Sequence, residues 1–377
     1  MDVDQANLAP DLAIVISFSG QGGVEKMITA LAERFVSLGK RVDLVAIKED
    51  KNKLEQLEAA GVNVVRLHVQ HSTMATRALA SYLDRRQPSV VLAAKDRAGR
   101  STLAARRMSS SKPRVFIRIG TTLSEAIRHH SRFRQWLRYR PIRRSYPHAD
   151  GIVAISQGVA DDVAFISNID KGKIHVIPNP VIGSALRTLA KADISHPWVD
   201  HSQEPVIIGM GRLTRQKDFP TLIKGFAELQ KSRKSRLIIL GEGRDRYNLT
   251  QLVRQLGIQD RVDMPGHQAN PYCWLSRASL FVLSSRWEGF GNVLAEAMAL
   301  GIPVVSTDCR SGPRELLDGG RLGPLVPVGD HNALSRAMRD MLDHPTHPSD
   351  LKEGVTEYHA ETSARRYLEV MGLEVPK

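Results

Sequence analysis

Two glutamates, Glu288 and Glu296, stand on either side of a glycine-rich turn in the second half of the chain. The apolar run before them predicts a buried strand at 280–284, and a helix is expected to begin at Asn292. Glu288 would then lie in the loop before this helix and Glu296 about one turn inside it. Paired glutamates are common, but N–H groups at a helix start bind anions. We therefore predict that this segment grips two parts of an extended anionic ligand.

Two cations, Arg212 and Lys217, follow the strand expected at 205–210, in a loop that also contains Gly211. Arginine provides a planar fork of donors and lysine a mobile point charge, which together suit a diphosphate. The alternative is a solvated basic loop without a ligand. The anion site inferred at Asn292 favours the diphosphate, because both loops could serve one ligand.

A third glycine-rich loop, at 17–27, connects a strand expected at 12–18 to a helix expected at 23–38. The loop lacks the complete G-x-G-x-x-G pattern, and no acidic residue closes the next strand at a suitable distance. A dinucleotide-binding site is therefore not predicted. Gly22 and Gly23 can still present backbone N–H groups to a ligand.

Strands and helices alternate along nearly the whole chain, and the strands are continuously apolar, which indicates parallel sheets covered on both faces. The remaining strands are expected at 41–47, 62–67, 89–94, 113–119, 150–155, 173–177, 236–240, 302–307 and 324–328, and the remaining helices near 219–232, 245–256, 292–300 and 331–343. The predicted fold class is α/β, with two doubly wound Rossmann-like domains that face a central cleft. Such domains bind ligands at the C-terminal ends of their strands.

The length of 377 residues suits two domains, and a weakly patterned stretch at roughly 180–204 is the expected hinge. We expect an N-terminal domain at 1–185, a linker at 186–204 and a second domain at 205–345. The tail at 346–377 is expected to be helical and able to pack back on the first domain.

The composition excludes several classes of protein. With 42% hydrophobic and 25% charged residues, each domain can bury a core, so wholesale disorder is excluded. Two cysteines are too few for a disulfide framework and suit a reducing compartment. The N-terminal sequence MDVDQ is acidic, and no apolar run approaches the roughly 18–20 residues that span a bilayer, so we expect a cytoplasmic protein.

Taken together, these motifs resemble the retaining, nucleotide-sugar-dependent glycosyltransferases of family 4. The similarity lies in EGFGNVLAEAMALGIPVV from Glu288, GRLTRQKDFPTLIKGF at 211–226, ILGEGRDR at 239–246, VIPNPV at 176–181 and GGVE at 22–25, in the same order over roughly residues 12–345. The resemblance implies a GT-B fold, with the acceptor bound mainly by the first domain and the sugar donor mainly by the second.

The resemblance also assigns roles to residues. Glu288 would hydrogen-bond hydroxyls of the transferred sugar and Glu296 the ribose hydroxyls. Arg212 and Lys217 would neutralise the diphosphate as the sugar bond breaks, so Glu288, Arg212 and Lys217 are the expected catalytic residues. The other expected donor-binding residues are Gly23, Glu242, Gly243, Gly266, His267, Gly289, Phe290, Gly291, Asn292 and Val293.

The family works without a bound metal, and no Asp-x-Asp or His/Cys cluster in this chain has metal-ligand spacing. We therefore expect no metal and no other cofactor. The family's retention of configuration is attributed to front-face departure and attack, so no protein nucleophile is expected either.

On the acceptor side the chain departs from the family pattern. Many relatives carry a histidine after the strand that corresponds to 113–119, whereas this chain has Arg118 and Thr121 there. Lys95 and Asp96, at the end of an earlier strand, are the other acceptor-side candidates. The alternative roles for Lys95 and Asp96 are in a helix cap or on the surface.

The net charge of +13 comes from one segment, because residues 95–144 hold fifteen basic and two acidic side chains while the rest of the chain is balanced. Within it, 126–144 mixes arginines with aromatic residues, and Phe133, Trp136 and Leu137 recur at helical spacing before a proline. Such a helix can bind the headgroups of an anionic membrane. The alternative is that the aromatic residues face the core and the arginines are merely solvated. Nucleic-acid binding is not expected, because no known nucleic-acid module accompanies the segment.

The sequence thus predicts a retaining glycosyltransferase that transfers a hexose or N-acetylhexosamine from a nucleoside diphosphate, with UDP as the expected nucleotide. The expected acceptor is a glycan or a lipid-linked sugar of cell-envelope polysaccharide or lipopolysaccharide synthesis. The expected location is cytoplasmic, with peripheral contact at the inner face of the plasma membrane. Two alternatives are a nucleotide-sugar epimerase of the same fold and a non-catalytic nucleotide- or polyanion-binding protein.

Overall fold

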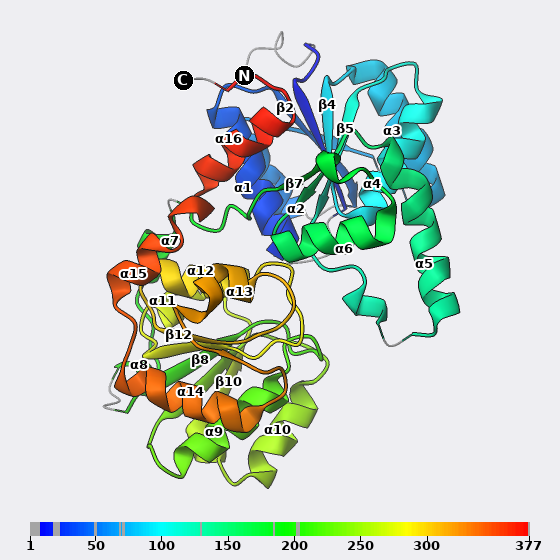
Figure 1. The fold of residues 1–377 in the computed structure, drawn as a ribbon. Helices are drawn as coiled ribbons and strands as arrows, with labels where there is room; N and C mark the ends of the chain where they lie inside the picture. The colour runs from blue at the N-terminus through cyan, green and yellow to red at the C-terminus, as the bar shows by residue number, and fades with distance from the viewer. Residues whose placement is uncertain are drawn as a thin grey trace. The chain divides into compact units, whose positions relative to one another are not determined.

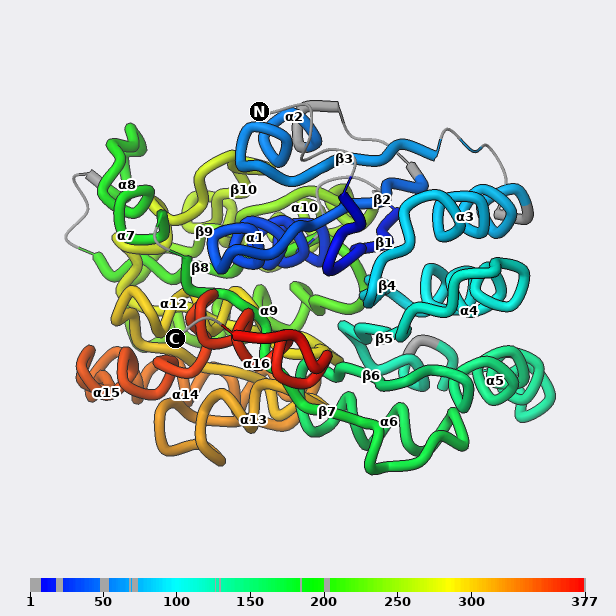
Figure 2. The backbone as a smooth tube through the Cα atoms, turned by 90° about the horizontal axis from the view of Figure 1, so that it is seen from above, coloured from blue at the N-terminus to red at the C-terminus, as the bar shows by residue number. Residues whose placement is uncertain are grey.

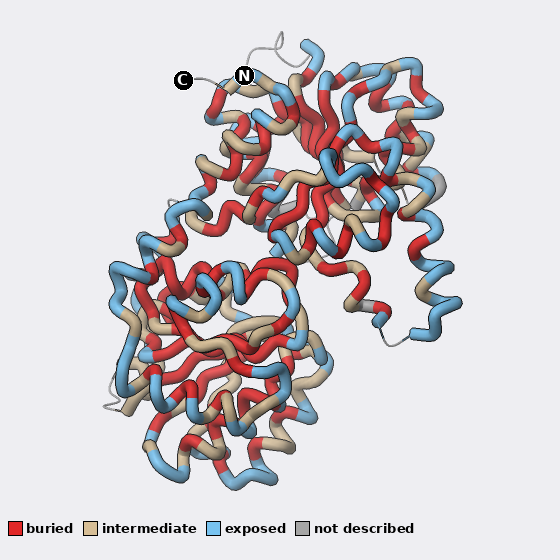
Figure 3. The backbone as a smooth tube through the Cα atoms, viewed as in Figure 1, coloured by how far each residue is buried: buried red, intermediate tan, exposed pale blue. Residues whose placement is uncertain are grey.

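The computed structural model describes residues 8–17, 23–48, 51–67, 69, 72–128, 130–183, 185–200 and 204–375. The chain forms two compact units (Figure 1). Unit 1 consists of Met1–Pro180 together with Ala360–Lys377, and unit 2 of Val181–His359. In both units the central strands are the most deeply buried elements (Figure 3).

The division between the units differs from the expected domain boundaries. It falls at Pro180 rather than at 185, and the expected linker at 186–204 is part of unit 2. This stretch holds two short helices, α7 (Ala185–Ala190) and α8 (Pro197–Asp200). The Ser276 hydroxyl donates to the carbonyl oxygen of Ala190 over 2.9 Å, which ties α7 to unit 2. The tail after 345 is also divided, because only Ala360–Lys377 joins unit 1.

Unit 1 is built on a seven-stranded parallel sheet with the order β3-β2-β1-β4-β5-β6-β7, which Figure 2 shows side by side. Its strands are β1 (Leu12–Ser17), β2 (Val42–Lys48), β3 (Asn63–Arg66), β4 (Val90–Ala94), β5 (Arg114–Ile119), β6 (Gly151–Ala154) and β7 (Ile174–Val176). Every strand predicted in the first half of the chain is confirmed, because continuous apolar runs such as LAIVIS are buried on both faces.

Helices cover both faces of this sheet. They are α1 (Gly23–Ser37), α2 (Lys51–Ala59), α3 (Ser72–Arg86), α4 (Asp96–Met108), α5 (Arg132–Ser145), α6 (Gln157–Ser167) and α16 (Ala360–Val370). Leu92 and Phe116 join a core cluster with α1, α2 and the C-terminal α16. Ile117 points to the opposite face, where Gly99 of α4 approaches it so closely that a Cβ atom would lie 2.6 Å from its side chain.

Unit 2 is built on a six-stranded parallel sheet with the order β10-β9-β8-β11-β12-β13. Its strands are β8 (Val206–Met210), β9 (Arg236–Leu240), β10 (Val262–Gly266), β11 (Leu280–Leu283), β12 (Val304–Thr307) and β13 (Leu325–Val326). The sequence did not predict β10. This edge strand ends in Pro265 and Gly266, two residues that disfavour strands, and its pairing with β9 is irregular there.

The helices of unit 2 likewise lie on both faces of its sheet. They are α9 (Phe219–Gln230), α10 (Arg246–Gln255), α11 (Tyr272–Leu275), α12 (Asn292–Ala299), α13 (Pro313–Leu316), α14 (His331–Asp343) and α15 (Pro348–Glu353). Phe226 of α9 and Met338 of α14 pack in one core cluster with Ile239 and Val282 of the sheet. Figure 1 shows α12 and α13 on the opposite face.

The strand order reverses once in each sheet, between β1 and β4 in unit 1 and between β8 and β11 in unit 2. Loops that leave neighbouring strands at such a point diverge to opposite faces and open a crevice at the C-terminal edge of the sheet. The segments at 211–218 and 284–291 leave β8 and β11, so they meet at the reversal in unit 2. Lys95 and Asp96 occupy the corresponding position after β4 in unit 1.

Candidate functional site

The loops after β8 and β11 are held together by hydrogen bonds. The Ser284 hydroxyl donates to the carbonyl oxygen of Lys217 over 2.8 Å. The Arg286 N–H donates to the carbonyl oxygen of Gln216 over 2.8 Å, and the Gln216 side-chain amide donates to that of Trp287 over 3.1 Å. These contacts fix the two loops against each other, and with them the side chains that each loop carries.

Lys217 and Glu288 meet at this junction. The Lys217 Nζ donates to Oε1 of Glu288 over 2.6 Å, and the Ser285 hydroxyl donates to the same oxygen over 2.6 Å. Their side chains are only 16% and 9% exposed. Gly211, with a φ of 155°, leaves room for the lysine stem, because a Cβ atom there would lie 2.9 Å from Cε of Lys217. Two residues predicted for different parts of a ligand thus form one buried ion pair.

Arg212 has different surroundings. Its side chain is exposed and, within the part of the chain that the structure describes, no hydrogen bond or ion pair engages its guanidinium. It follows β8 by two residues and therefore stands at the same strand reversal as the Lys217–Glu288 pair. The loop thus offers one cation that is already paired and one that is available to an anion.

Glu296 is buried in α12, one turn after the helix begins at Asn292. The hydroxyl of Tyr272 donates to Glu296 Oε1 over 2.9 Å, and both side chains are buried. Tyr272 lies in the short helix α11 and was not predicted as a site residue. No local sequence signal marks it, since only the fold brings α11 beside α12.

The remaining predicted donor-side residues of unit 2 lie along the same strand edge. Glu242 follows β9, and its carboxylate accepts a hydrogen bond from Arg246 over 2.7 Å. Gly266 ends β10 with a φ of 86°, and a Cβ atom there would lie 2.8 Å from Glu242 Oε1. The carbonyl oxygen of Glu242 accepts from the N–H of Leu213, which joins this edge to the loop after β8. The other expected donor-binding residues lie along the same edge and differ in burial. Gly243 and His267 are exposed, Gly289, Phe290 and Gly291 are buried, and Asn292 and Val293 are half-buried.

Two further residues, Thr307 and Cys309, lie near Glu288. The Thr307 hydroxyl donates to the carbonyl oxygen of Ser285 over 2.6 Å, which supports the serine that binds Glu288. Cys309 is buried. Its burial, and secondarily the negative charge of Glu288, raise the pKa of the Cys309 thiol to about 12, so the thiol stays protonated at neutral pH.

In unit 1 the acceptor-side candidates Lys95 and Asp96 are both engaged by the protein. The Lys95 ammonium donates to Oε1 of Glu25 over 2.8 Å, and Glu25 is buried near the start of α1. Lys95 has a φ of 119°, a strained value for a residue with a side chain. Asp96 accepts two hydrogen bonds of 3.0 Å from Arg100 and one of 3.1 Å from Tyr146.

The other acceptor-side candidates lie after β5. Arg118 is in the interior, 1% exposed, where its guanidinium donates to the side-chain oxygen of Asn179. Within the described part of the chain, its Nε and Nη1 atoms have no hydrogen-bond partner. Arg118 therefore does not present its charge at the surface, in contrast to half-buried Thr121. Gly23, the expected donor contact of this unit, begins α1.

Two negative findings concern only the described residues. Within the ranges given above, no three His, Cys, Asp or Glu side chains gather closely enough to hold a metal ion. No helix among those residues combines the length and the apolar character that crossing a membrane requires.

Two family models match consecutive parts of the chain. The model described as a glycosyl transferase 4-like domain matches residues 22–180, and the model for glycosyl transferases group 1 matches residues 191–358. The chain belongs to the family 4 type of glycosyltransferases. The resemblance drawn from the sequence is therefore confirmed.

Curated relatives of this chain include two bacterial enzymes. The N-acetylgalactosamine-N,N'-diacetylbacillosaminyl-diphospho-undecaprenol 4-alpha-N-acetylgalactosaminyltransferase of Campylobacter jejuni is 32% identical over 198 residues, 52% of either chain. The lipopolysaccharide core biosynthesis glycosyltransferase LpsE of Rhizobium meliloti is 34% identical over 203 residues, 54% of this chain and 57% of the relative. The chain thus spans about half the length of the curated relatives it matches.

Solved structures confirm the GT-B fold of two Rossmann-like domains. The Anabaena protein Alr3699/HepE, in complex with UDP and glucose, has a TM-score of 0.79 at 18% identity, over 96% of this chain and 99% of the other. A lipopolysaccharide outer core galactosyltransferase has a TM-score of 0.73 at 21% identity, over 96% and 98%.

Proposed function

We propose that this protein is a retaining glycosyltransferase that transfers a hexose or an N-acetylhexosamine from a UDP-sugar to a glycan or lipid-linked acceptor of cell-envelope polysaccharide synthesis. The observation that carries the proposal is the Lys217–Glu288 pair, because it joins a phosphate-binding cation to a sugar-binding carboxylate at the strand reversal of unit 2. The names of the Campylobacter and Rhizobium relatives support an acceptor of the cell envelope, and the first of these names describes a lipid-linked diphosphate.

The diphosphate of the donor would compete with Glu288 for Lys217. As the bond to the sugar breaks, the leaving diphosphate gains negative charge, which the Lys217 ammonium can stabilise in a largely buried setting. Arg212 provides a second cation from the same loop without breaking an existing ion pair. We propose that these two side chains supply the positive charge that a metal ion supplies in other transferases.

Glu288 would then be free to accept hydrogen bonds from the hydroxyls of the transferred sugar. The Ser285 hydroxyl donates to one carboxylate oxygen of Glu288, so the carboxylate is already oriented when the donor arrives. Glu296, oriented by Tyr272, would accept from the ribose hydroxyls, and the edge at Gly266 and His267 would lie against the base. Each carboxylate thus has a structural partner that fixes its position.

We also propose that α5 brings unit 1 to an anionic membrane. Phe133, Trp136 and Leu137 are 69%, 47% and 53% exposed, so the aromatic side chains do not face the core. The rings of Phe133 and Trp136 stack 6.0 Å apart, and the guanidinium of Arg140 lies 5.4 Å from the Trp136 ring. An exposed apolar row flanked by cations is typical of helices that lie in the headgroup layer.

The test is a sugar-transfer assay on the full chain with radiolabelled UDP- and GDP-sugars and a bacterial membrane extract. We expect label from a UDP-hexose or UDP-N-acetylhexosamine to enter extractable glycan or lipid. NMR of the product should show the anomeric configuration of the donor. Conversion of the free nucleotide sugar to an epimer without an acceptor, or nucleotide binding without turnover, would contradict the proposal.

A further inference from the structure

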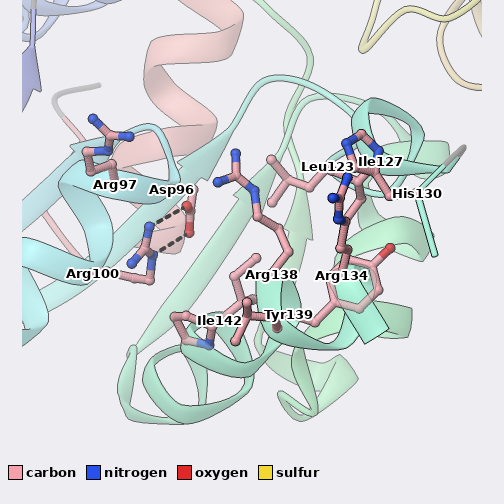
Figure 4. Close-up of a pocket in the computed structure, with 12 residues that line it drawn as sticks. Asp96, Arg97, Arg100, Leu123, Ile127, His130, Arg134, Arg138, Tyr139 and Ile142 are labelled. Carbon is pink, nitrogen blue, oxygen red and sulfur yellow. Dashed lines mark hydrogen bonds and ion pairs between the residues drawn. The ribbon is translucent and has the colours of Figure 1, made fainter. Parts of the chain in front are cut away.

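Unit 1 contains a cavity of about 700 Å³ between α4, α5 and the residues Leu123, Ile127 and His130 (Figure 4). Its charged lining comes from three directions. The cavity is lined by Arg97 and Arg100 of α4, His130, and Arg134 and Arg138 of α5. In Figure 4 the side chain of Arg138 extends from α5 into the space that the other cations surround.

The positive charge of this cavity is largely uncompensated. Within the described ranges, Asp96 is the single carboxylate that lines it, and Asp96 already accepts hydrogen bonds from Arg100 and Tyr146. Among the residues that the structure describes, no carboxylate pairs with Arg97, Arg134 or Arg138. Three guanidinium groups thus line the cavity without a carboxylate partner among the described residues, and they are available to an anion.

The lining also includes apolar side chains. Leu123, Ile127 and Ile142 contribute aliphatic side chains, and Leu137 both lines the cavity and reaches the exposed row of α5. In Figure 4 Leu123 and Ile127 lie beside His130 and Arg134, so a ligand that fills the cavity would meet cations and hydrocarbon together. The apolar path continues outward along Phe133 and Trp136 of α5.

The cavity also has a defined place in the fold. Asp96 begins α4, directly after Lys95, which follows β4 at the strand reversal of unit 1. This is the edge at which parallel sheets bind their ligands. A group held by Arg97 and Arg100 would therefore lie close to the predicted acceptor-side residues Lys95 and Asp96.

We propose that this cavity binds the phosphate or diphosphate group of a lipid-linked acceptor, with the hydrocarbon chain leaving along α5. The inference rests on the proposed function, which it sharpens by naming the chemical class of the acceptor. Guanidinium groups bind phosphate through paired N–H donors. A bulk phospholipid headgroup with one negative charge would leave most of the cations unpaired, so a diphosphate matches the lining better.

Direct binding tests the proposal, with farnesyl diphosphate as the probe in isothermal titration calorimetry of the full chain. We expect the wild type to bind it, and to bind inorganic diphosphate more weakly because that probe lacks a chain. The double variant Arg134→Gln/Arg138→Gln should bind farnesyl diphosphate at least about tenfold more weakly, since each charge-assisted hydrogen bond contributes substantially. The control variant Arg77→Gln/Arg107→Gln removes the same charge from exposed positions of α3 and α4 and should bind like the wild type.

A separate measurement distinguishes failure of this inference from failure of the proposed function. UDP should raise the melting temperature of the wild type and of the Arg134→Gln/Arg138→Gln variant equally, which also shows that the variant is folded. If UDP binds but farnesyl diphosphate does not, the cavity assignment is overturned while the donor site stands. Equal binding by both double variants, or saturation of the cavity by phosphatidylglycerol vesicles in place of farnesyl diphosphate, would also overturn it. The single variant Arg97→Gln tests the α4 side independently, and undiminished binding there would count against the cavity.

Discussion

At the scale of single residues, the site in unit 2 consists of charges that the protein holds in pairs. Lys217 and Glu288 neutralise each other in a setting with little solvent, and Ser285 binds the same carboxylate oxygen. Removing only one member of such a pair strongly lowers stability, because the other charge is left buried without a partner. A ligand that brings its own phosphate and hydroxyls can replace both partners at once.

The first prediction concerns the stability of this pair. Lys217→Met should lower the free energy of unfolding by about 3 kcal/mol, since Glu288 keeps its charge without the lysine. Lys217→Met combined with Glu288→Gln should recover much of that loss, because neither charge remains. Urea denaturation measures both. Lys231→Met, just after α9, breaks an exposed pair with Glu228 and should lower the free energy of unfolding by less than about 1 kcal/mol. An equally small loss in Lys217→Met would contradict the cost expected for a buried charge.

The second prediction concerns Tyr272. Tyr272→Phe removes the hydroxyl that donates to Glu296 and leaves the buried ring in place. We expect KM for the donor to rise about tenfold with little change in kcat, because the loosened carboxylate would bind the ribose less well in the ground and transition states alike. Steady-state kinetics with the active UDP-sugar provide the measurement. An unchanged KM would show that Tyr272 does not position Glu296.

The third prediction follows from the raised pKa of Cys309. Above about pH 9 the unfolded thiol ionises while the folded one, with its pKa of about 12, stays protonated, so stability falls as pH rises. Cys309→Ala should therefore lose less stability than the wild type between about pH 8 and about pH 10. Urea midpoints at the two pH values give the comparison, with Cys273→Ala as the control. Parallel pH dependence of Cys309→Ala and wild type would contradict the assignment.

A residue of this site could be predicted from the sequence only where it stands in a recognisable motif. Lys217 and Glu288 stand in motifs with a glycine turn and a helix start, so each was predicted. Their mutual ion pair was not, because it joins residues 71 positions apart and depends on the loops after β8 and β11 meeting. Tyr272 and Ser285 act by contacting a carboxylate, and such contacts have no sequence pattern.

At the scale of elements, α5 shows where local rules were overridden. The apolar stripe was expected to end before Pro141, yet the helix continues through Pro141 to Ser145. Tyr139 and Ile142, on either side of the proline, are buried, and Pro141 itself is exposed. The burial of these neighbours offsets the hydrogen bond that the proline removes. The edge strand β10 was not predicted, because its proline and glycine are typical of a turn. Pairing with β9 nevertheless holds this segment as a strand.

The fourth prediction belongs to α5. Trp136 is one of four tryptophans of the chain and the only one of residues 1–180, so an emission shift that Trp136→Phe abolishes reports on this helix. Phosphatidylglycerol vesicles should shift the emission to the blue, and Trp136→Phe should abolish the shift. Replacing the exposed Arg132 and Arg144, which do not line the cavity, with Gln should weaken vesicle binding, because each cation near an anionic surface contributes about 1 kcal/mol. Undiminished cosedimentation of that variant with the vesicles would rule out this surface.

At the scale of the whole molecule, the excess positive charge and the proposed donor site belong to different units. The net excess of +13 lies within residues 95–144, which belong to unit 1, whereas Arg212 and Lys217 belong to unit 2. Screening by salt acts strongly on exposed charges and weakly on buried pairs. Raising the salt concentration should therefore weaken vesicle binding much more than it changes KM for the donor.

We propose above all that Glu288 accepts hydrogen bonds from the sugar of a bound nucleotide sugar. The most direct test is the rate of UDP release in the presence of membrane extract, compared among wild type, Glu288→Gln and Glu228→Gln. Glu228 lies on α9 and pairs only with exposed Lys231 among the described residues, so it is a matched control. We predict that Glu288→Gln lowers kcat by roughly 10²- to 10³-fold while Glu228→Gln behaves as wild type. Release by Glu288→Gln at the wild-type rate would contradict the account.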